Sequence, residues 1–478
     1  MHNKVQLITY VDRLGGVSLN ALQALLEGSL GGVFGGVHLL PFFHPIDGTD
    51  AGFDPIDHTT VDARLGGWAD VAKLCGTQPV MADVIVNHMS SDSPRYVDWS
   101  ERGAASEFSD LFLTLSSVFP DGATEDALLA VYRPRPGLPL TYATLANGEK
   151  KILWTTFTAK QIDIDVESAS GTRYLDSILD TLAKAGVTMI RMDAVGYAIK
   201  RAGRDSFMMP ETFAFIDEFA SRARARGLEV LVEVHSYFQK QIEIAKRVDW
   251  VYDFALPPLV LHALFNGAPD ALSRWIDIRP TNAVTVLDTH DGIGIIDIGA
   301  DATDRENRRG LVPPHELDQL VETIHRNSGG QSRDATGAAA SNLDLYQVNC
   351  TFYDALGRDD NAYLIARAVQ FFLPGIPQVY YVGLLAGEND MNLLAETGVG
   401  RDINRHYYDE AEIKTALQKP VVQSLIELIR FRNSHPAFGG SFTHTRDGTT
   451  LELAWTHGIA FARLTVDFAT RTESISHS

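Results

Sequence analysis

Eight short apolar runs recur along this chain, and helical patterns follow most of them. This alternation predicts parallel strands joined by helical crossovers. Eight such units with long inserted loops favour a closed (β/α)8 TIM barrel over a doubly wound sheet, and no GxGxxG turn follows a strand. The expected strands are Val5–Val11, Gly36–Phe42, Val80–Asn87, Met189–Val195, Glu229–His235, Trp250–Phe254, Ala283–Asp291 and Ile376–Val382.

Two gaps, after the third and seventh expected strands, are much longer than an ordinary loop. Loops of this length are unusual without structure of their own, so each gap predicts a subdomain inserted at the barrel mouth. The last residues alternate like exposed strands and predict a short antiparallel β appendage, with a disordered end at 471–478. The expected segments are 1–87, 168–291 and 358–440 for the barrel, 88–167 for inserted subdomain B, 292–357 for inserted subdomain B′, and 441–478 for the C-terminal β-domain.

Three acidic residues, Asp193, Glu233 and Asp291, end the fourth, fifth and seventh expected strands. The C-terminal ends of parallel barrel strands meet at one mouth, so the three carboxyl groups should converge. One carboxyl can attack an anomeric carbon, a second can carry a proton, and a third can stabilise the positively charged transition state. A single acid at such a position is more simply a helix N-cap, but three on separate strands favour glycosyl transfer.

Arg191 should lie on the same face as Asp193, because alternate residues of a strand point the same way. A neighbouring guanidinium is expected to lower the pKa of the Asp193 carboxyl and keep it anionic, as a nucleophile requires. Glu233 has to carry a proton near neutral pH instead, which the negative charge of its neighbours favours.

Composition excludes several classes of partner. The net charge of −20 argues against nucleic acid, whose phosphates are bound by clustered Lys and Arg. No run approaches the roughly 18 apolar residues of a membrane span, and the first apolar run is too short for a signal peptide, so a cytoplasmic protein without membrane contact is expected. Cys75 and Cys350 form no zinc or disulfide pattern. No metal and no cofactor are expected.

Several segments carry a resemblance to a known family. Four resemble the ordered motifs of the α-amylase superfamily (glycoside hydrolase family 13): Asp83–His88, Ile190–Val195, Glu233–His235 and Val286–Asp291. Four further segments closely resemble the sucrose phosphorylases of that family: Pro41–His58, Tyr132–Gly137, Ala338–Gln347 and Gly400–Tyr408. The resemblance covers roughly residues 3–440.

The resemblance implies a retaining hexosyltransferase of carbohydrate metabolism. It would convert sucrose and phosphate into α-D-glucose 1-phosphate and D-fructose through a covalent glucosyl-enzyme, and also transfer glucose to other acceptors. Asp193 would be the nucleophile, Glu233 the acid/base and Asp291 the transition-state stabiliser. The implied glucosyl contacts are Asp50, Phe53, His88, Phe157, Arg191, His290 and Arg401. The implied acceptor contacts are Tyr197, His235, Leu343, Asp344 and Gln347 for fructose, Arg135 and Tyr346 for phosphate, and Gln161 at the opening.

Other functions are open at this point. A phosphorylase acting on sucrose 6-phosphate or glucosylglycerate, or a sucrose hydrolase, would keep the same three acids, so the choice rests on the acceptor loops. A barrel that had become a binding subunit would lack a catalytic acid. The C-terminal β-domain of this family is usually longer than the residues after 440, and a homodimer is compatible with the family.

Overall fold

The computed structural model describes residues 3–48, 50–134, 137–301, 307–337 and 347–478. Within them, eight parallel strands close into a barrel in the order β1-β16-β13-β12-β11-β10-β5-β2, which confirms the predicted fold. The barrel strands are β1 (Gln6–Thr9), β2 (Val37–Leu39), β5 (Val80–Ile85), β10 (Met189–Asp193), β11 (Glu229–Val232), β12 (Trp250–Asp253), β13 (Ala283–Thr285) and β16 (Ile376–Tyr380).

Strands β5 and β10 show why the apolar runs were recognisable, because every residue of both is buried. Helices cover the outside of a parallel barrel and side chains fill its inside, so such strands are mostly apolar. The two strands pair in a register that places Arg191 opposite Asp83. A buried charge pair therefore lies inside the barrel, below its mouth.

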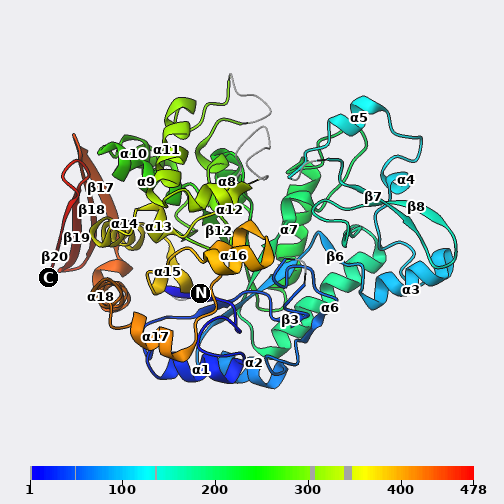
Figure 1. Ribbon diagram of the computed structural model, residues 1–478, viewed down its shortest axis with the longest axis horizontal. Coiled ribbons are helices and arrows are strands. Elements are labelled where there is room, and N and C mark those ends of the chain that lie inside the picture. Colours follow the sequence, from blue (N-terminus) through cyan, green and yellow to red (C-terminus); the bar gives the residue numbers. More distant parts are fainter. Residues whose placement is uncertain (1–2, 49, 135–136, 302–306, 338–346) are drawn as a thin grey trace.

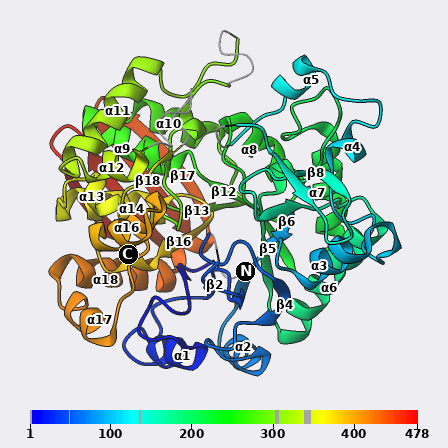
Figure 2. The ribbon, with the colours of Figure 1, turned by 45° about the vertical axis from the view of Figure 1, so that its right-hand side comes forward.

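Helices surround the barrel (Figures 1 and 2). Ser168 caps the start of α6 by accepting a hydrogen bond from the Gly171 amide, and Gly186, with φ of 88°, ends this helix in the left-handed conformation. No described helix is both long and apolar enough to cross a membrane. The surrounding helices are α1 (Leu19–Glu27), α2 (Trp68–Cys75), α6 (Ala169–Ala185), α7 (Pro210–Arg224), α8 (Phe238–Ala245), α9 (Leu256–Asn266), α10 (Asp270–Ile278), α14 (Asp360–Phe372) and α18 (Pro420–Ser434).

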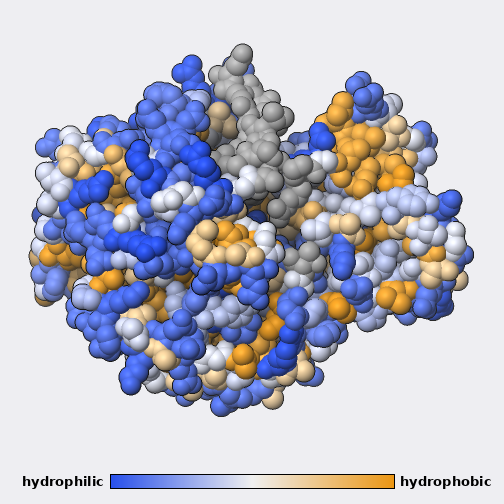
Figure 3. Space-filling view, viewed as in Figure 1, coloured by the Kyte–Doolittle hydropathy of each residue, from blue (hydrophilic) through white to orange (hydrophobic). Residues whose placement is uncertain are grey.

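The first long gap forms a projection on the right of Figure 1. It has a small core of its own, made by Leu113, Val118, Phe119, Val131 and Trp154. Figure 3 shows hydrophobic side chains exposed on this projection, where the structure exposes Leu129, Leu138, Tyr142 and Ile152. Its elements are β6 (His88–Ser90), α3 (Pro94–Arg102), η1 (Gly103–Ala105), α4 (Leu115–Val118), α5 (Glu125–Leu129), β7 (Leu140–Thr144), β8 (Lys150–Trp154) and β9 (Gln161–Asp163).

The second gap also has regular structure, and its two strands β14 and β15 pair antiparallel. Its elements are β14 (Ile293–Gly294), η3 (Ile296–Ile298), α11 (Pro314–Asn327), α12 (Gln331–Thr336), β15 (Gln347–Val348) and α13 (Phe352–Ala355). Further short elements lie in other loops: β3 (Phe43–His44), β4 (Asp57–Val61), η2 (Val195–Tyr197), α15 (Tyr381–Leu384), α16 (Met391–Thr397), η5 (Gly400–Asn404) and α17 (Glu410–Ala416).

The chain ends in a four-stranded antiparallel sheet, at the left of Figure 1. The expectation of a disordered end was wrong, because the last strand pairs with its neighbour from Thr472 to His477. Its side chains are largely exposed, so its polar sequence shows no apolar alternation although its backbone completes the sheet. The elements are η6 (Pro436–Gly439), β17 (Ser441–Asp447), β18 (Thr450–His457), β19 (Ala460–Asp467) and β20 (Thr472–His477).

The seventh barrel strand is shorter than expected, since β13 stops at Thr285. Side chains from elsewhere hold the segment that follows. Arg367 of α14 donates to Asp288 over 2.5 Å, and Asn404 donates to the Thr289 carbonyl over 2.9 Å. These contacts replace strand pairing, so Asp291 lies on a fixed loop beyond the strand.

Candidate active site

A pocket of about 500 Å³ opens at the C-terminal ends of the barrel strands and contains most of the predicted site. A larger surface groove of about 760 Å³ lies between α1, α17 and α18, but none of the described residues that line it is a predicted catalytic acid. The predicted residues that line the first pocket are Asp50, Phe53, His88, Phe157, Gln161, Asp193, Tyr197, Glu233, His235, His290, Asp291, Gln347 and Arg401.

Asp193 is the last residue of β10, and a buried arginine holds it. Arg191 NH1 donates to Asp193 Oδ1 over 2.8 Å and to Asp83 Oδ1 over 2.5 Å. The expected shared face is thus present. Directly after the acid, Ala194 adopts a left-handed conformation with φ of 56°, which is uncommon for a residue other than glycine and is found often at functional sites.

The expected direction for the pKa of Asp193 was wrong. Burial raises the pKa of this carboxyl well above its usual range, and although the Arg191 guanidinium lowers it, the negative charge of Glu233 raises it further. The sequence placed the arginine correctly, but the outcome depends on how completely the site excludes water.

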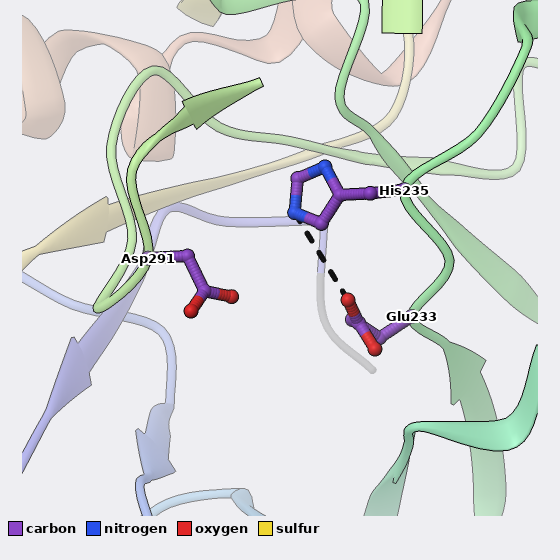
Figure 4. Close-up of side chains that lie close together, drawn as sticks. All are labelled: Glu233, His235 and Asp291. Atoms are coloured by element: carbon purple, nitrogen blue, oxygen red, sulfur yellow. Dashed lines mark ion pairs between the residues drawn. The ribbon is translucent and has the colours of Figure 1, made fainter. Parts of the chain in front are cut away.

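Glu233 directly follows β11 and lies near Arg191 and Ala194 on one side and His235 on the other. The Ala194 amide donates to its Oε2 over 3.3 Å, and Arg191 NH2 lies 4.0 Å from the same oxygen. His235 Nε2 lies 4.0 Å from the other oxygen, Oε1, as Figure 4 shows. Glu233 is partly exposed and lines the pocket, so its carboxyl group can contact a bound ligand.

The surroundings of Asp291 favour its ionised form. Burial alone would raise the pKa of this carboxyl, but the guanidinium of Arg401 lies 2.9 Å from Oδ1 and lowers the pKa well below its usual range, with help from His290. Arg401 comes from η5, in the loop after β16. Its NH1 also lies 3.8 Å from Asp50 Oδ2.

Aromatic rings form the walls of the pocket. Phe53 stacks on the His290 imidazole with ring centroids 4.6 Å apart and planes 11° apart. Burial lowers the pKa of His290 to about 3, so this ring is neutral at pH 7. Phe157 lies edge-on to both His88 and Tyr197, each at 5.2 Å. An apolar wall with neutral imidazoles suits a sugar ring, whose faces are apolar and whose edge carries hydroxyls.

The side chains of Glu233, His235 and Asp291 lie close together (Figure 4), and one possible ligand atom of each lies within 4.8 Å of the others. Carboxylates and imidazoles are also the donors of many metal centres. Here a guanidinium already lies on Asp291, and Asp297 Oδ2 lies 2.8 Å from His235 Nδ1. The charges of this cluster are thus paired by side chains, which suits acid–base chemistry.

Some predicted residues cannot be placed in this way. Arg135, Leu343, Asp344 and Tyr346 lie outside the described residues. Pro134, directly before Arg135, and Gln347, directly after Tyr346, line the pocket.

The charged residues that contact the predicted side chains include three that were not predicted as site residues. Arg405 NH1 lies 3.6 Å from Asp50 Oδ1 and belongs to the same motif as Arg401, a signal that could have identified it. Asp83 was recognised in its motif but not as the partner of Arg191. Asp297, the partner of His235, lies in the second insertion and has no signal in the sequence.

Comparison with known proteins gives the family. The chain is 60% identical over 479 residues to a sucrose phosphorylase from Agrobacterium vitis, covering 100% of this chain and 98% of the relative. It is 57% identical to one from Bifidobacterium adolescentis, covering 98% and 92%. The solved sucrose 6F-phosphate phosphorylase from Thermoanaerobacter thermosaccharolyticum matches with a TM-score of 0.91 and 38% identity, covering 100% and 96%. No family model matches. The chain belongs to the sucrose phosphorylase family, within glycoside hydrolase family 13.

Proposed function

We propose that this chain transfers the glucosyl group of sucrose to phosphate and releases α-D-glucose 1-phosphate and D-fructose. One observation carries the proposal: three carboxyl groups from separate barrel strands and loops meet in one pocket, each with a different cationic neighbour. Its membership of the sucrose phosphorylase family supports the choice of substrate.

In the first half-reaction, Asp193 attacks the anomeric carbon of the glucosyl unit. Arg191 holds Oδ1, and we assign the attack to Oδ2. As the bond to fructose breaks, Glu233 gives its proton to the departing oxygen, so fructose leaves as a neutral alcohol. The product of this step is a covalent glucosyl-enzyme on Asp193.

The transition state carries positive charge on the flattened ring. Asp291, kept anionic beside Arg401, stabilises that charge, and the aromatic faces of Phe53 and Phe157 add a cation–π contribution. We assign Asp50 and His88 to the sugar hydroxyls, because both line the same pocket.

In the second half-reaction, phosphate takes the place of fructose. Glu233, now a carboxylate, accepts the proton of the attacking phosphate oxygen, and the bond to Asp193 breaks. Two inversions give net retention at the anomeric carbon. We assign phosphate to Arg135 and Tyr346, and fructose to Tyr197, His235, Leu343, Asp344 and Gln347, following the resemblance.

Product analysis tests the proposal. With sucrose and phosphate, the protein should release glucose 1-phosphate and fructose in equal amounts, while free glucose stays a minor product. Free glucose as the main product would identify a hydrolase instead. A higher rate with sucrose 6F-phosphate or glucosylglycerate than with sucrose would favour the related phosphorylases.

The acceptor assignment has its own test. Arg135→Ala should weaken phosphorolysis more than hydrolysis, because an arginine fork binds two phosphate oxygens and has no such role toward water. An equal loss of both activities would refute the assignment. We also propose a cytoplasmic location and a homodimer, to be tested by cell fractionation and by sedimentation of the purified protein.

A further inference from the structure

The imidazole of His235 is held from several sides next to Glu233. Its Nδ1 lies 2.8 Å from Asp297 Oδ2, and its Nε2 lies 4.0 Å from Glu233 Oε1 (Figure 4). The ring stacks on Phe254 with centroids 3.8 Å apart and planes 14° apart. A carboxylate only accepts hydrogen bonds, so Nδ1 carries a proton and Nε2 is the atom directed toward the acid/base.

Asp297 belongs to η3 in the second insertion and is fully buried. Its Oδ1 accepts hydrogen bonds from the Ser236 amide over 3.1 Å and from Gln241 Nε2 over 2.9 Å, which leaves Oδ2 for His235. A buried carboxylate is costly unless a positive charge compensates it. Among the described residues, the side chain that can supply this charge is His235, 2.8 Å away.

Gly294 in β14 leaves room for the hydrogen bond between His235 and Asp297 because it has no side chain. A Cβ atom built on Gly294 would lie 2.1 Å from Asp297 Oδ2 and 3.0 Å from His235 Nδ1. Any side chain at this position would therefore push the carboxylate away from the imidazole. Three separate elements, the loop after β11, strand β14 and η3, meet at one hydrogen bond.

We propose that Asp297 is a positioning residue for the phosphate half-reaction: it holds His235 as a cation whose Nε2–H points at Glu233 and at the incoming phosphate. This inference rests on the proposed function. Phosphate has to approach a pocket that already contains Asp193, Glu233 and Asp291, and a fixed imidazolium offsets part of this repulsion. Water carries no charge, so hydrolysis of the glucosyl-enzyme needs this cation much less.

The charges around His235 agree with a cation. Asp297 faces it from η3, Glu233 from its own loop, and Asp291 from the segment after β13, where Arg401 already pairs with Asp291. Burial lowers the pKa of His235, but these carboxylates outweigh burial and raise the pKa above its ordinary value. The imidazolium thus persists to a higher pH than that of a free histidine.

The test compares Asp297→Asn with the unmodified protein from pH 5.5 to 8.5. We expect kcat/KM for phosphate to fall at least about tenfold at pH 7.5, and its alkaline limb to move down by about 1–3 pH units, the usual effect of one close opposite charge. Hydrolysis of sucrose without phosphate should fall much less. Asp354→Asn is the matched control: Asp354 is equally buried and hydrogen-bonded, in α13, and its loss should leave the alkaline limb in place.

Two further variants keep the test decisive if Asp297→Asn folds poorly. His235→Gln should remove the alkaline limb, and adding Asp297→Asn to it should not change the pH profile further. An unmoved limb in either single variant, with unchanged circular dichroism, would overturn the inference, as would equal losses of phosphorolysis and hydrolysis. If the unmodified protein forms no glucose 1-phosphate at all, the proposed function fails instead, so the two failures are distinguishable.

Discussion

Replacing Lys200 by Met should destabilise the fold at the joint between the barrel and its first insertion. The Lys200 ammonium is almost fully buried, with Nζ 2.6 Å from Asp163 Oδ2 in β9 and 2.6 Å from Asn87 Oδ1 after β5. It also donates to the carbonyl of Tyr197, beside the active-site pocket. One cation thus ties together three segments that are distant in sequence.

The magnitude follows from what the substitution leaves behind. Breaking a buried ion pair by removing one partner costs about 3–5 kcal/mol, because the remaining charge is uncompensated. Asp163 keeps two hydrogen bonds from Thr156, at 3.0 Å to the amide and 2.5 Å to the hydroxyl, so we take the lower end, about 3 kcal/mol. Each 1.4 kcal/mol is about tenfold, so the unfolding equilibrium constant should rise by more than about a hundredfold.

Urea unfolding at pH 7, followed by tryptophan fluorescence, measures this loss, since Trp154 is buried in the same insertion. Lys246→Met, on an exposed lysine, is the matched control and should change the unfolding free energy by less than about 0.5 kcal/mol. The double variant Lys200→Met/Asp163→Asn removes both charges of this pair and should recover at least half of the loss. A loss below about 1 kcal/mol, or a double variant no more stable than the single one, would refute the reasoning.

Three other predictions follow from the site. Arg401→Ala should lower kcat/KM for sucrose by about 10²–10³, because Asp291 loses the guanidinium that keeps it anionic; a drop under threefold would contradict this role. Phe53→Leu should lower kcat about fivefold to thirtyfold by removing the aromatic face, and an unchanged kcat would exclude a cation–π contribution. Asp193→Asn should abolish transfer. Burial raises the pKa of Asp193 in the folded protein, so ionisation of this carboxyl destabilises the fold as pH rises above the unfolded-state pKa near 3.8. The Asn variant does not ionise, so it should gain stability relative to the unmodified protein between pH 5 and pH 8. Equal urea midpoints of the two proteins at both pH values would contradict this direction.

The barrel could be predicted because each of its strands is recognisable within its own short stretch of sequence. Strands buried on both faces, such as β5 and β10, are mostly apolar runs, and an acid at the end of such a run marks the barrel mouth. The hydrogen-bond and ion-pair partners of the site residues could not be predicted in this way, because they are far apart in the sequence. His235 and Asp297 are 62 residues apart, and Arg191 and Asp83 are 108 apart. Only the path of the folded chain brings such pairs together.

The pKa of Asp193 shows a second limit of the sequence. The nearest charge, on Arg191, was evident from spacing and does lower the pKa, but the larger effect is burial, which no alternation of residues measures. The same holds for the neutrality of His290, where burial again exceeds the effect of the adjacent Asp291. In a closed pocket the sign of a pKa shift is therefore a property of the whole site.

The different distances around the three acids support their different roles. Asp291 has a guanidinium at 2.9 Å and Asp193 has one at 2.8 Å, and each of these contacts fixes the orientation of its carboxyl group. For Glu233 the ion pairs with Arg191 and His235 are both 4.0 Å long. A general acid has to lose its proton in one half-reaction and regain it in the next, and a short ion pair would bind the carboxylate form too firmly for that cycle. The carboxyl group with the longest ion pairs is thus the one suited to carry the proton.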